Sequence, residues 1–207
     1  MFLSDVEGDQ KDTHIVFLCD ASGSMSGDRV TNMNKAIGAA LIKTHAVAET
    51  LEQSSLNKID VSAIRFSDTA EWHTVPSRLH KQFTWDDILS PKGITNLGQA
   101  YSLLDSWLSS GAVNGVMHRL IVVLITDGMP TDEPSILSNW LESNMATDCF
   151  ERIAFALGSD AESSYLDEFV SHEDNLYVLR NESMLQEFLT RALTKSVSKA
   201  PLCTEQH

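Results

Sequence analysis

Short apolar runs alternate with segments of helical periodicity along most of this chain of 207 residues. Apolar runs that do not alternate with polar residues are typical of parallel strands covered on both faces. The segments between them repeat apolar residues every three or four positions, which gives a helix one buried stripe. The strands expected from this pattern are 14–20, 59–66, 69–75, 120–125, 153–157 and 176–179.

Alternation of strands and helices predicts an α/β fold: a doubly wound, mostly parallel sheet with helices on both faces. Segments 59–66 and 69–75 are separated only by the short turn Ser67-Asp68, so they are expected to form an antiparallel hairpin at one edge. The expected sheet is therefore six-stranded, with one antiparallel edge strand. The expected helices are about 30–51, 96–109, 134–141, 163–171 and 184–198.

Size and composition predict one domain over residues 14–198, with a flexible arm at 1–13 and a flexible tail at 199–207. The net charge of −14 argues against binding to nucleic acid or to an anionic membrane. No run approaches the ~20 apolar residues of a membrane helix, and the first residues do not resemble a signal peptide. The three cysteines are too scattered for a disulfide framework, which favours a cytoplasmic protein.

Oxygen-bearing side chains follow two of the expected strands. Asp20, Ser22 and Ser24 come directly after strand 14–20, and their spacing of two places them on one side of an extended segment. Asp127 follows strand 120–125, and Thr95 lies in the loop before helix 96–109. Because ligands bind at the carboxyl ends of strands in such folds, we expect these five side chains to meet at one edge of the sheet. Carboxylates and hydroxyls are ligands for a hard cation such as Mg²⁺.

Each of these residues also has a simpler explanation when it is considered alone. Ser24 or Ser26 is a candidate cap for the first helix, and Thr95 for the second. Asp127 is a candidate turn residue. Their expected meeting at one edge of the sheet favours the metal site.

Two further acids have alternative roles: Asp132 is expected to cap the helix near Pro134, and Asp28 to cap the first helix or to lie behind the site.

The segment Asp20-Ala21-Ser22-Gly23-Ser24, together with Thr95 and Thr126-Asp127-Gly128, resembles the metal-ion-dependent adhesion site of von Willebrand factor type A domains. The resemblance covers about residues 14–195. It implies bound Mg²⁺, with Mn²⁺ or Ca²⁺ as alternatives, and hydroxyl ligands from Ser22, Ser24 and Thr95. It also implies that Asp20 and Asp127 often act through water, and that a partner protein supplies an Asp or Glu carboxylate to the metal.

Within this family, the chain resembles small intracellular bacterial members found at tellurium-resistance and stress-response loci. Residues 124–132 and 153–158 carry this resemblance. It implies a scaffold without enzymatic activity that works with protein kinases or phosphatases. Met25 and Met129 each lie beside a motif element; they either line the rim of the site and contact the partner or fold back onto the core.

Two rival functions follow from the same residues. A Mg²⁺-dependent phosphohydrolase on a similar sheet needs a second acid two residues after the first, and Ser22 occupies that position. A structural module whose ion only stabilises loops is the other rival.

Trp72 and Trp85 lie in less regular segments, where each is either an exposed anchor for a partner or a packing residue.

Overall fold

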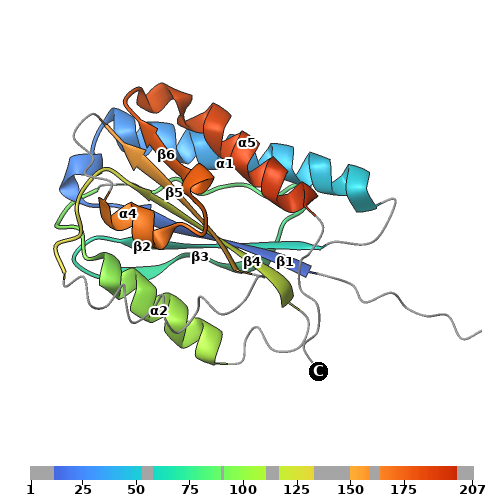
Figure 1. The fold of residues 1–207 in the computed structure, drawn as a ribbon, viewed down its shortest axis with the longest axis horizontal. Coiled ribbons are helices and arrows are strands. Elements are labelled where there is room, and N and C mark those ends of the chain that lie inside the picture. Colours follow the sequence, from blue (N-terminus) through green and yellow to red (C-terminus); the bar gives the residue numbers. More distant parts are fainter. Residues whose placement is uncertain are drawn as a thin grey trace, which may run out of the picture.

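The computed structural model describes residues 12–52, 58–89, 91–110, 117–132, 150–158 and 164–199. Within them the chain forms a six-stranded sheet in the order β3-β2-β1-β4-β5-β6. Only β3 is antiparallel to its neighbour, and it lies at one edge (Figure 1). The strands are β1 (Asp12–Asp20), β2 (Ile59–Phe66), β3 (Ala70–Arg78), β4 (Met117–Thr126), β5 (Phe150–Leu157) and β6 (Leu176–Leu179).

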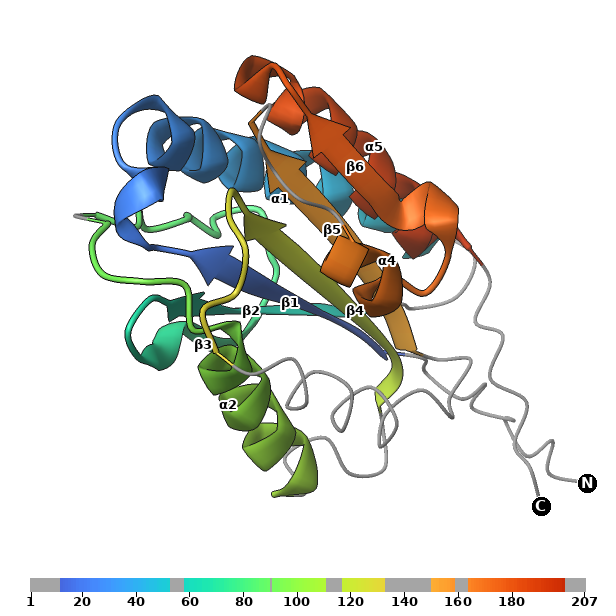
Figure 2. The same ribbon diagram turned by 60° about the vertical axis from the view of Figure 1, so that its left-hand side comes forward.

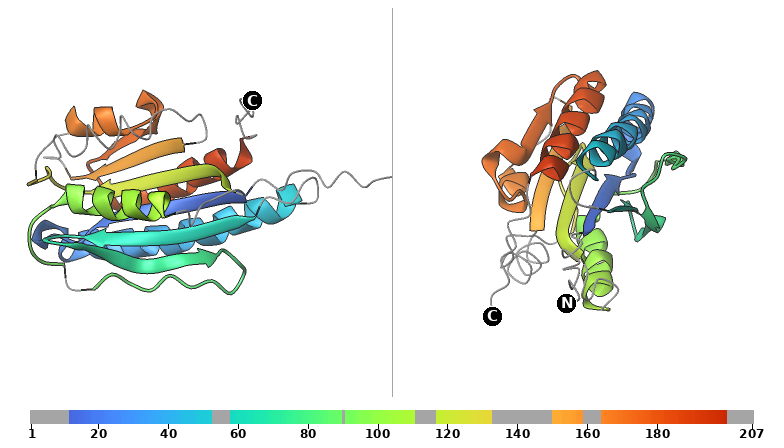
Figure 3. Two further views of the ribbon diagram at one scale, coloured as in Figure 1. Left: turned by 90° about the horizontal axis from the view of Figure 1, so that it is seen from below. Right: turned by 90° about the vertical axis from the view of Figure 1, so that its right-hand side faces the viewer.

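Helices cover both faces of this sheet. Helices α1 (Asp28–Glu52) and α5 (Leu185–Ser198) lie side by side on one face, and α2 (Leu97–Ser109) lies on the other (Figure 3). The short α4 (Ser164–Phe169) packs into the same core as α2. Three short 3-10 turns complete the described elements: η1 (Gly23–Met25), η2 (Glu173–Asn175) and η3 (Glu182–Met184).

The two cores follow from the alternation of side chains along the strands. In β1, Ile15, Phe17 and Cys19 pack with α1 and α5, whereas Val16 and Leu18 pack with α2. All five are fully buried. A strand buried on both faces has no polar side, which explains why this run is continuously apolar in the sequence.

The predicted fold class is confirmed, with small differences at element ends. Strand β1 begins at Asp12, two residues inside the expected arm, and β4 begins at Met117 rather than 120. The helix expected at 134–141 lies outside the described residues. None of the helices that the structure describes is long and apolar enough to cross a membrane.

Trp72 and Trp85 are both packing residues. The Trp72 ring meets the Trp107 ring edge-on, with centroids 5.7 Å apart, against the α2 core. The Trp85 ring meets Phe17 of β1 at 6.1 Å, on the α1 side. The alternative of an exposed anchor is therefore wrong for both residues.

Candidate metal centre

Three loops meet at the carboxyl edge of the sheet (Figure 2). They are residues 20–26 after β1, residues 91–96 before α2, and residues 126–132 after β4. Backbone hydrogen bonds join them: Gly23 N–H donates to the Gly93 carbonyl at 3.0 Å, and Thr131 N–H donates to the Thr95 carbonyl at 2.8 Å. The fold thus places all five predicted site residues on these adjoining loops.

Asp20 is fully buried at the end of β1. Its Oδ1 accepts the Ser22 backbone N–H at 2.8 Å, and its Oδ2 accepts the Thr126 hydroxyl at 2.7 Å. Thr126 is within reach because β1 and β4 are neighbouring parallel strands. Burial raises the pKa of the Asp20 carboxyl and the Asp127 charge adds to the rise, while the hydrogen bonds from Thr126 and Ser22 oppose it.

Asp127 is held from the opposite loop. Its side chain is fully buried, its Oδ1 accepts the Ser24 hydroxyl at 2.8 Å, and its Oδ2 pairs with the Arg29 guanidinium of α1. The Ser24 hydroxyl oxygen lies 3.1 Å from that of Ser22. Side chains from the first and third loops are therefore already joined by hydrogen bonds.

This hydrogen-bond pattern fits a hard divalent cation. Each carboxylate oxygen of Asp20 and Asp127 already accepts from a donor of the protein. The Ser24 proton is committed to Asp127, and one lone pair of Ser24 accepts from Ser22, so a second lone pair is left to face a cation. Among the described residues, no three His, Cys, Asp or Glu side chains gather as a metal-binding group. A cation here would need the hydroxyls as ligands, and an all-oxygen set suits Mg²⁺.

Thr95 is buried in the loop that leads into α2. Its hydroxyl faces the third loop, because a Cβ added to Gly128 would lie 3.8 Å from the Thr95 Oγ1. The first turn of α2 is capped by Asp132 instead, whose Oδ2 accepts the Gly98 N–H at 2.5 Å. Asp132 thus caps α2, whereas we expected it to cap the helix near Pro134, which lies outside the described residues. The capping alternative for Thr95 is not supported.

The serines after β1 do not cap α1 either. Ser24 donates to Asp127, and the Ser26 hydroxyl lies 3.4 Å from the Pro91 carbonyl. Helix α1 starts after Gly27, whose φ of 78° is a conformation that favours glycine. Asp28 is exposed at the first position of α1.

The rim hypothesis is wrong for Met25. Its side chain is fully buried in the core beneath α1, because η1 turns it inward. Met129 is 45% exposed, so it stays a predicted contact for a partner.

Sequence reasoning missed Arg29 and Tyr165, and it named Thr126 only as part of a motif, without a role. Arg29 pairs with Asp127, Thr126 donates to Asp20, and the Tyr165 hydroxyl of α4 donates to the Gly128 carbonyl at 2.7 Å. One signal for Arg29 was available: a cation in the first turn of a helix is disfavoured by the helix dipole, so it requires acidic neighbours. No local pattern identifies Tyr165, because its partner lies 37 residues away.

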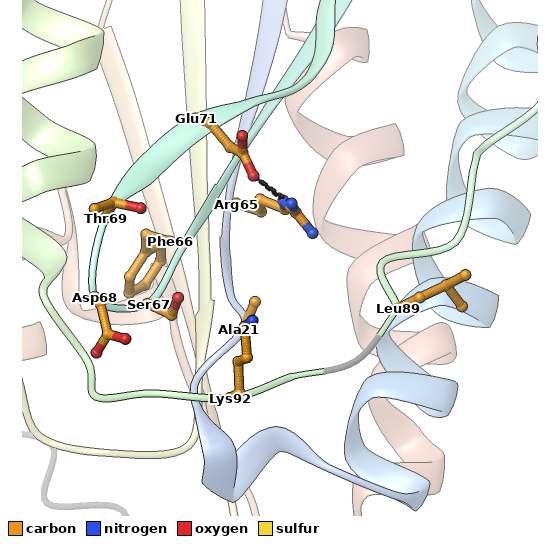
Figure 4. Close-up of a pocket in the computed structure, with 9 residues that line it drawn as sticks. All are labelled: Ala21, Arg65, Phe66, Ser67, Asp68, Thr69, Glu71, Leu89 and Lys92. Atoms are coloured by element: carbon orange, nitrogen blue, oxygen red, sulfur yellow. Dashed lines mark hydrogen bonds and ion pairs between the residues drawn. The ribbon is translucent and has the colours of Figure 1, made fainter.

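A pocket of about 270 Å³ lies beside the first loop (Figure 4). The Arg65–Glu71 ion pair forms one wall, and Ala21 lies next to Lys92 on another. The Lys92 N–H donates to the Ala21 carbonyl at 2.9 Å, so the pocket adjoins the Asp20-to-Ser24 segment directly. A molecule that covers the candidate site has this hollow beside it.

The site and the fold together define a Rossmann-like domain with a candidate cation site at the carboxyl edge of its sheet. The family model for the von Willebrand factor type A domain matches residues 14–191, and the chain therefore belongs to this family. A comparison with curated protein sequences found no match.

Solved structures share this fold at low sequence identity. A von Willebrand factor type A protein from Catenulispora acidiphila has a TM-score of 0.67 and 17% identity over 92% of this chain and 44% of its own. The ArnB paralog VWA2 from Sulfolobus acidocaldarius has a TM-score of 0.61 and 18% identity over 88% and 45%. Proximal thread matrix protein 1 from the mussel byssus, with a zinc-occupied MIDAS motif, has a TM-score of 0.63 and 16% identity over 93% of this chain and 47% of its own. The chain thus spans less than half the length of these structures.

Proposed function

We propose that this domain is a Mg²⁺-dependent protein-binding module that captures a partner's Asp or Glu carboxylate. The residues proposed to hold the cation are Asp20, Ser22, Ser24, Thr95 and Asp127. The proposal is carried by one observation: the hydroxyls of Ser22 and Ser24 lie 3.1 Å apart between two carboxylates whose oxygens already accept hydrogen bonds. Mn²⁺ and Ca²⁺ are the alternative ions.

The side chains have different proposed roles. Ser22 and Ser24 bind the cation directly, with Thr95 as a third hydroxyl ligand in some states. Asp20 and Asp127 act through water, because protein donors already occupy their oxygens. With few anionic ligands bound directly, the cation would supply an electrophilic position for an outside carboxylate. The proposed partner surface includes the exposed Met129.

The proposal does not include enzymatic activity. A phosphohydrolase of similar topology needs an acid at the position of Ser22, and a serine does not act as a general acid at neutral pH. Ser22 is also 2% exposed and hydrogen-bonded to Ser24, which suits a ligand that is fixed in place.

The biological setting is proposed from the resemblance of residues 124–132 and 153–158. We infer a cytoplasmic scaffold of a bacterial stress response of the tellurium-resistance type, with a protein kinase or phosphatase as partner. The net charge of −14 supports a protein partner over nucleic acid or an anionic membrane.

The metal site is tested by isothermal titration of Mg²⁺ and Mn²⁺ into the wild-type domain and into Asp127→Ala. The wild type is expected to bind one ion, and Asp127→Ala to bind much more weakly. Asp174→Ala is a matched control, because Asp174 is exposed in η2 at the opposite edge of the sheet. Equal affinity of Asp127→Ala and the wild type would refute the site.

Partner capture is tested separately. Proteins retained from a cell extract in Mg²⁺ should be released by EDTA and should not bind to Asp127→Ala, while circular dichroism shows an unchanged fold. Proteins that stay bound in the presence of EDTA would indicate a metal-independent interface. Hydrolysis of an aryl phosphate by the wild type, lost in Asp20→Asn, would replace the binding proposal by the phosphohydrolase.

A further inference from the structure

Arg29 links the candidate metal centre to a part of the chain that does not touch it. Its Nη1 pairs with the Asp127 Oδ2 and lies 3.4 Å from the Ser24 carbonyl. Its Nε donates to the Glu182 Oε1 at 2.7 Å. Glu182 begins η3, which leads directly into α5. One guanidinium therefore joins a predicted metal-site carboxylate to an acid 55 residues further along the sequence.

Neighbouring residues fix the position of the Arg29 guanidinium and keep it charged. The side chain is 33% exposed, between the fully buried Asp127 and the 20% exposed Glu182. The end of β5 leaves room for it, because a Cβ added to Gly158 would lie 2.9 Å from the Arg29 Nη2. The hydrogen bond from Arg29 to Glu182 raises the pKa of the guanidinium, which stays charged.

We propose that Arg29 is a positioning residue that sets the metal affinity of this site, and that Glu182 tunes the affinity through Arg29. The guanidinium orients the Asp127 carboxylate, but it is also a fixed positive charge beside the place where a divalent cation binds. Like charges repel, so Arg29 weakens cation binding. Glu182 pairs with Arg29 and offsets this charge, so it strengthens cation binding without contacting the cation.

This inference rests on the proposed function and gives it a regulatory element. A site kept at low affinity by an internal cation fills more completely when a partner brings a carboxylate, because the added negative charge favours the ion. By thermodynamic linkage, the ion favours the partner by the same factor. By lowering the affinity of the free site, Arg29 makes occupancy by the ion depend on the partner.

The experiment is a set of Mg²⁺ and Mn²⁺ titrations at low salt on the wild type, Arg29→Met, Glu182→Gln and the double variant. Arg29→Met is expected to bind about three- to tenfold more tightly, and Glu182→Gln more weakly by a similar factor. In the double variant the effect of Glu182→Gln disappears, because the charge that Glu182 offsets is absent. Arg29→Lys keeps the charge but loses the fork that contacts both acids, so its affinity is expected to stay closer to the wild type than that of Arg29→Met.

Salt dependence separates a charge effect from a steric one. The changes in affinity should shrink when NaCl is raised from 50 mM to 500 mM, since the screening length falls below about 5 Å. Arg78→Met and Asp60→Asn are the matched controls, because that pair, at 3.1 Å, lies at the opposite end of β2. Neither control variant should change the affinity.

The outcomes distinguish this inference from the function on which it rests. Arg29→Met binding more weakly than the wild type, or a Glu182→Gln effect that persists without Arg29, would overturn the role of Arg29 and leave the metal site intact. No binding of either ion by the wild type or any variant would overturn both. Thermal unfolding of each variant followed by circular dichroism establishes that the folded domain is compared.

Discussion

One buried amide anchors the part of the connection between β3 and α2 that contains Trp85 and Ile88. Asn34 of α1 is 6% exposed, and its Nδ2 donates to the Ile88 carbonyl at 3.0 Å. Its Oδ1 accepts the Ile88 N–H at 2.9 Å and the Trp85 Nε1–H at 3.1 Å. These three bonds fix Trp85 and Ile88 against α1. Asn34 therefore ties an irregular segment to the helix beside it.

Asn34→Ala removes all three hydrogen bonds and leaves their partners in Ile88 and Trp85 without them. At about 1 kcal/mol net for each bond, the free energy of unfolding should fall by about 3 kcal/mol. For a chain of this size, that loss lowers the melting temperature by roughly 6–12 °C. Urea unfolding followed by circular dichroism measures the loss, and hydrogen exchange at the Ile88 amide reports the local effect.

The matched control is Thr31→Ala, also on α1. The Thr31 hydroxyl bonds to the Gly27 carbonyl at 2.9 Å on an exposed surface. Its removal should change the free energy of unfolding by less than about 0.5 kcal/mol. A loss below about 1 kcal/mol in Asn34→Ala, with unchanged exchange at Ile88, would show that Asn34 does not anchor this segment.

Three further predictions concern pH, backbone strain and metal binding. Burial lowers the pKa of His14 from 6.5 to about 4, so the unfolded chain binds a proton between these values and the folded chain does not. The free energy of unfolding should therefore fall by up to about 3 kcal/mol as the pH is lowered from above 6.5 towards 4. Over the same pH range, the urea midpoint of His14→Gln should fall less than that of the wild type. Gly158→Ala, at a φ of 104° and close to Arg29, should lose about 1–3 kcal/mol in the same assay, and an unchanged midpoint would refute the strain. Mg²⁺ at a hundred times its dissociation constant should raise the free energy of unfolding by about 2.7 kcal/mol, with no rise in Asp127→Ala.

The sheet and the donor loops were predictable because they depend on local patterns. Continuous apolar runs mark strands that are buried on both faces, and residues directly after such strands fall at one edge. Asp20 and Asp127 were placed by this reasoning alone. The bonds from Arg29 to Asp127 and from Thr126 to Asp20 were not predictable, because they join residues far apart in the sequence. Asp132 shows the difference: it was assigned to the nearest expected helix, but it caps α2, with its partner Gly98 34 residues away.

The error at Met25 has a different physical cause. Proximity to a motif says nothing about the direction of a side chain in a short turn, and η1 directs Met25 into the core beneath α1. An exposed position next to a motif, such as that of Met129, becomes visible only when the loop has been placed. The exposure of a residue beside a motif is therefore poorly predicted from the sequence alone.

The exposure of the site residues separates two of the functions considered. An ion that only stabilises loops is expected to lie in a closed site, whereas an ion that binds an outside ligand needs an open position, as zinc sites illustrate. Asp20, Ser22 and Thr95 are buried, but Ser24 is exposed at the same edge as Met129. The proposed ligand residues are therefore fixed by hydrogen bonds on the buried side of the site, and the site is open to solvent on the other side. This asymmetry favours an ion with an outside ligand over an ion whose only role is in the fold.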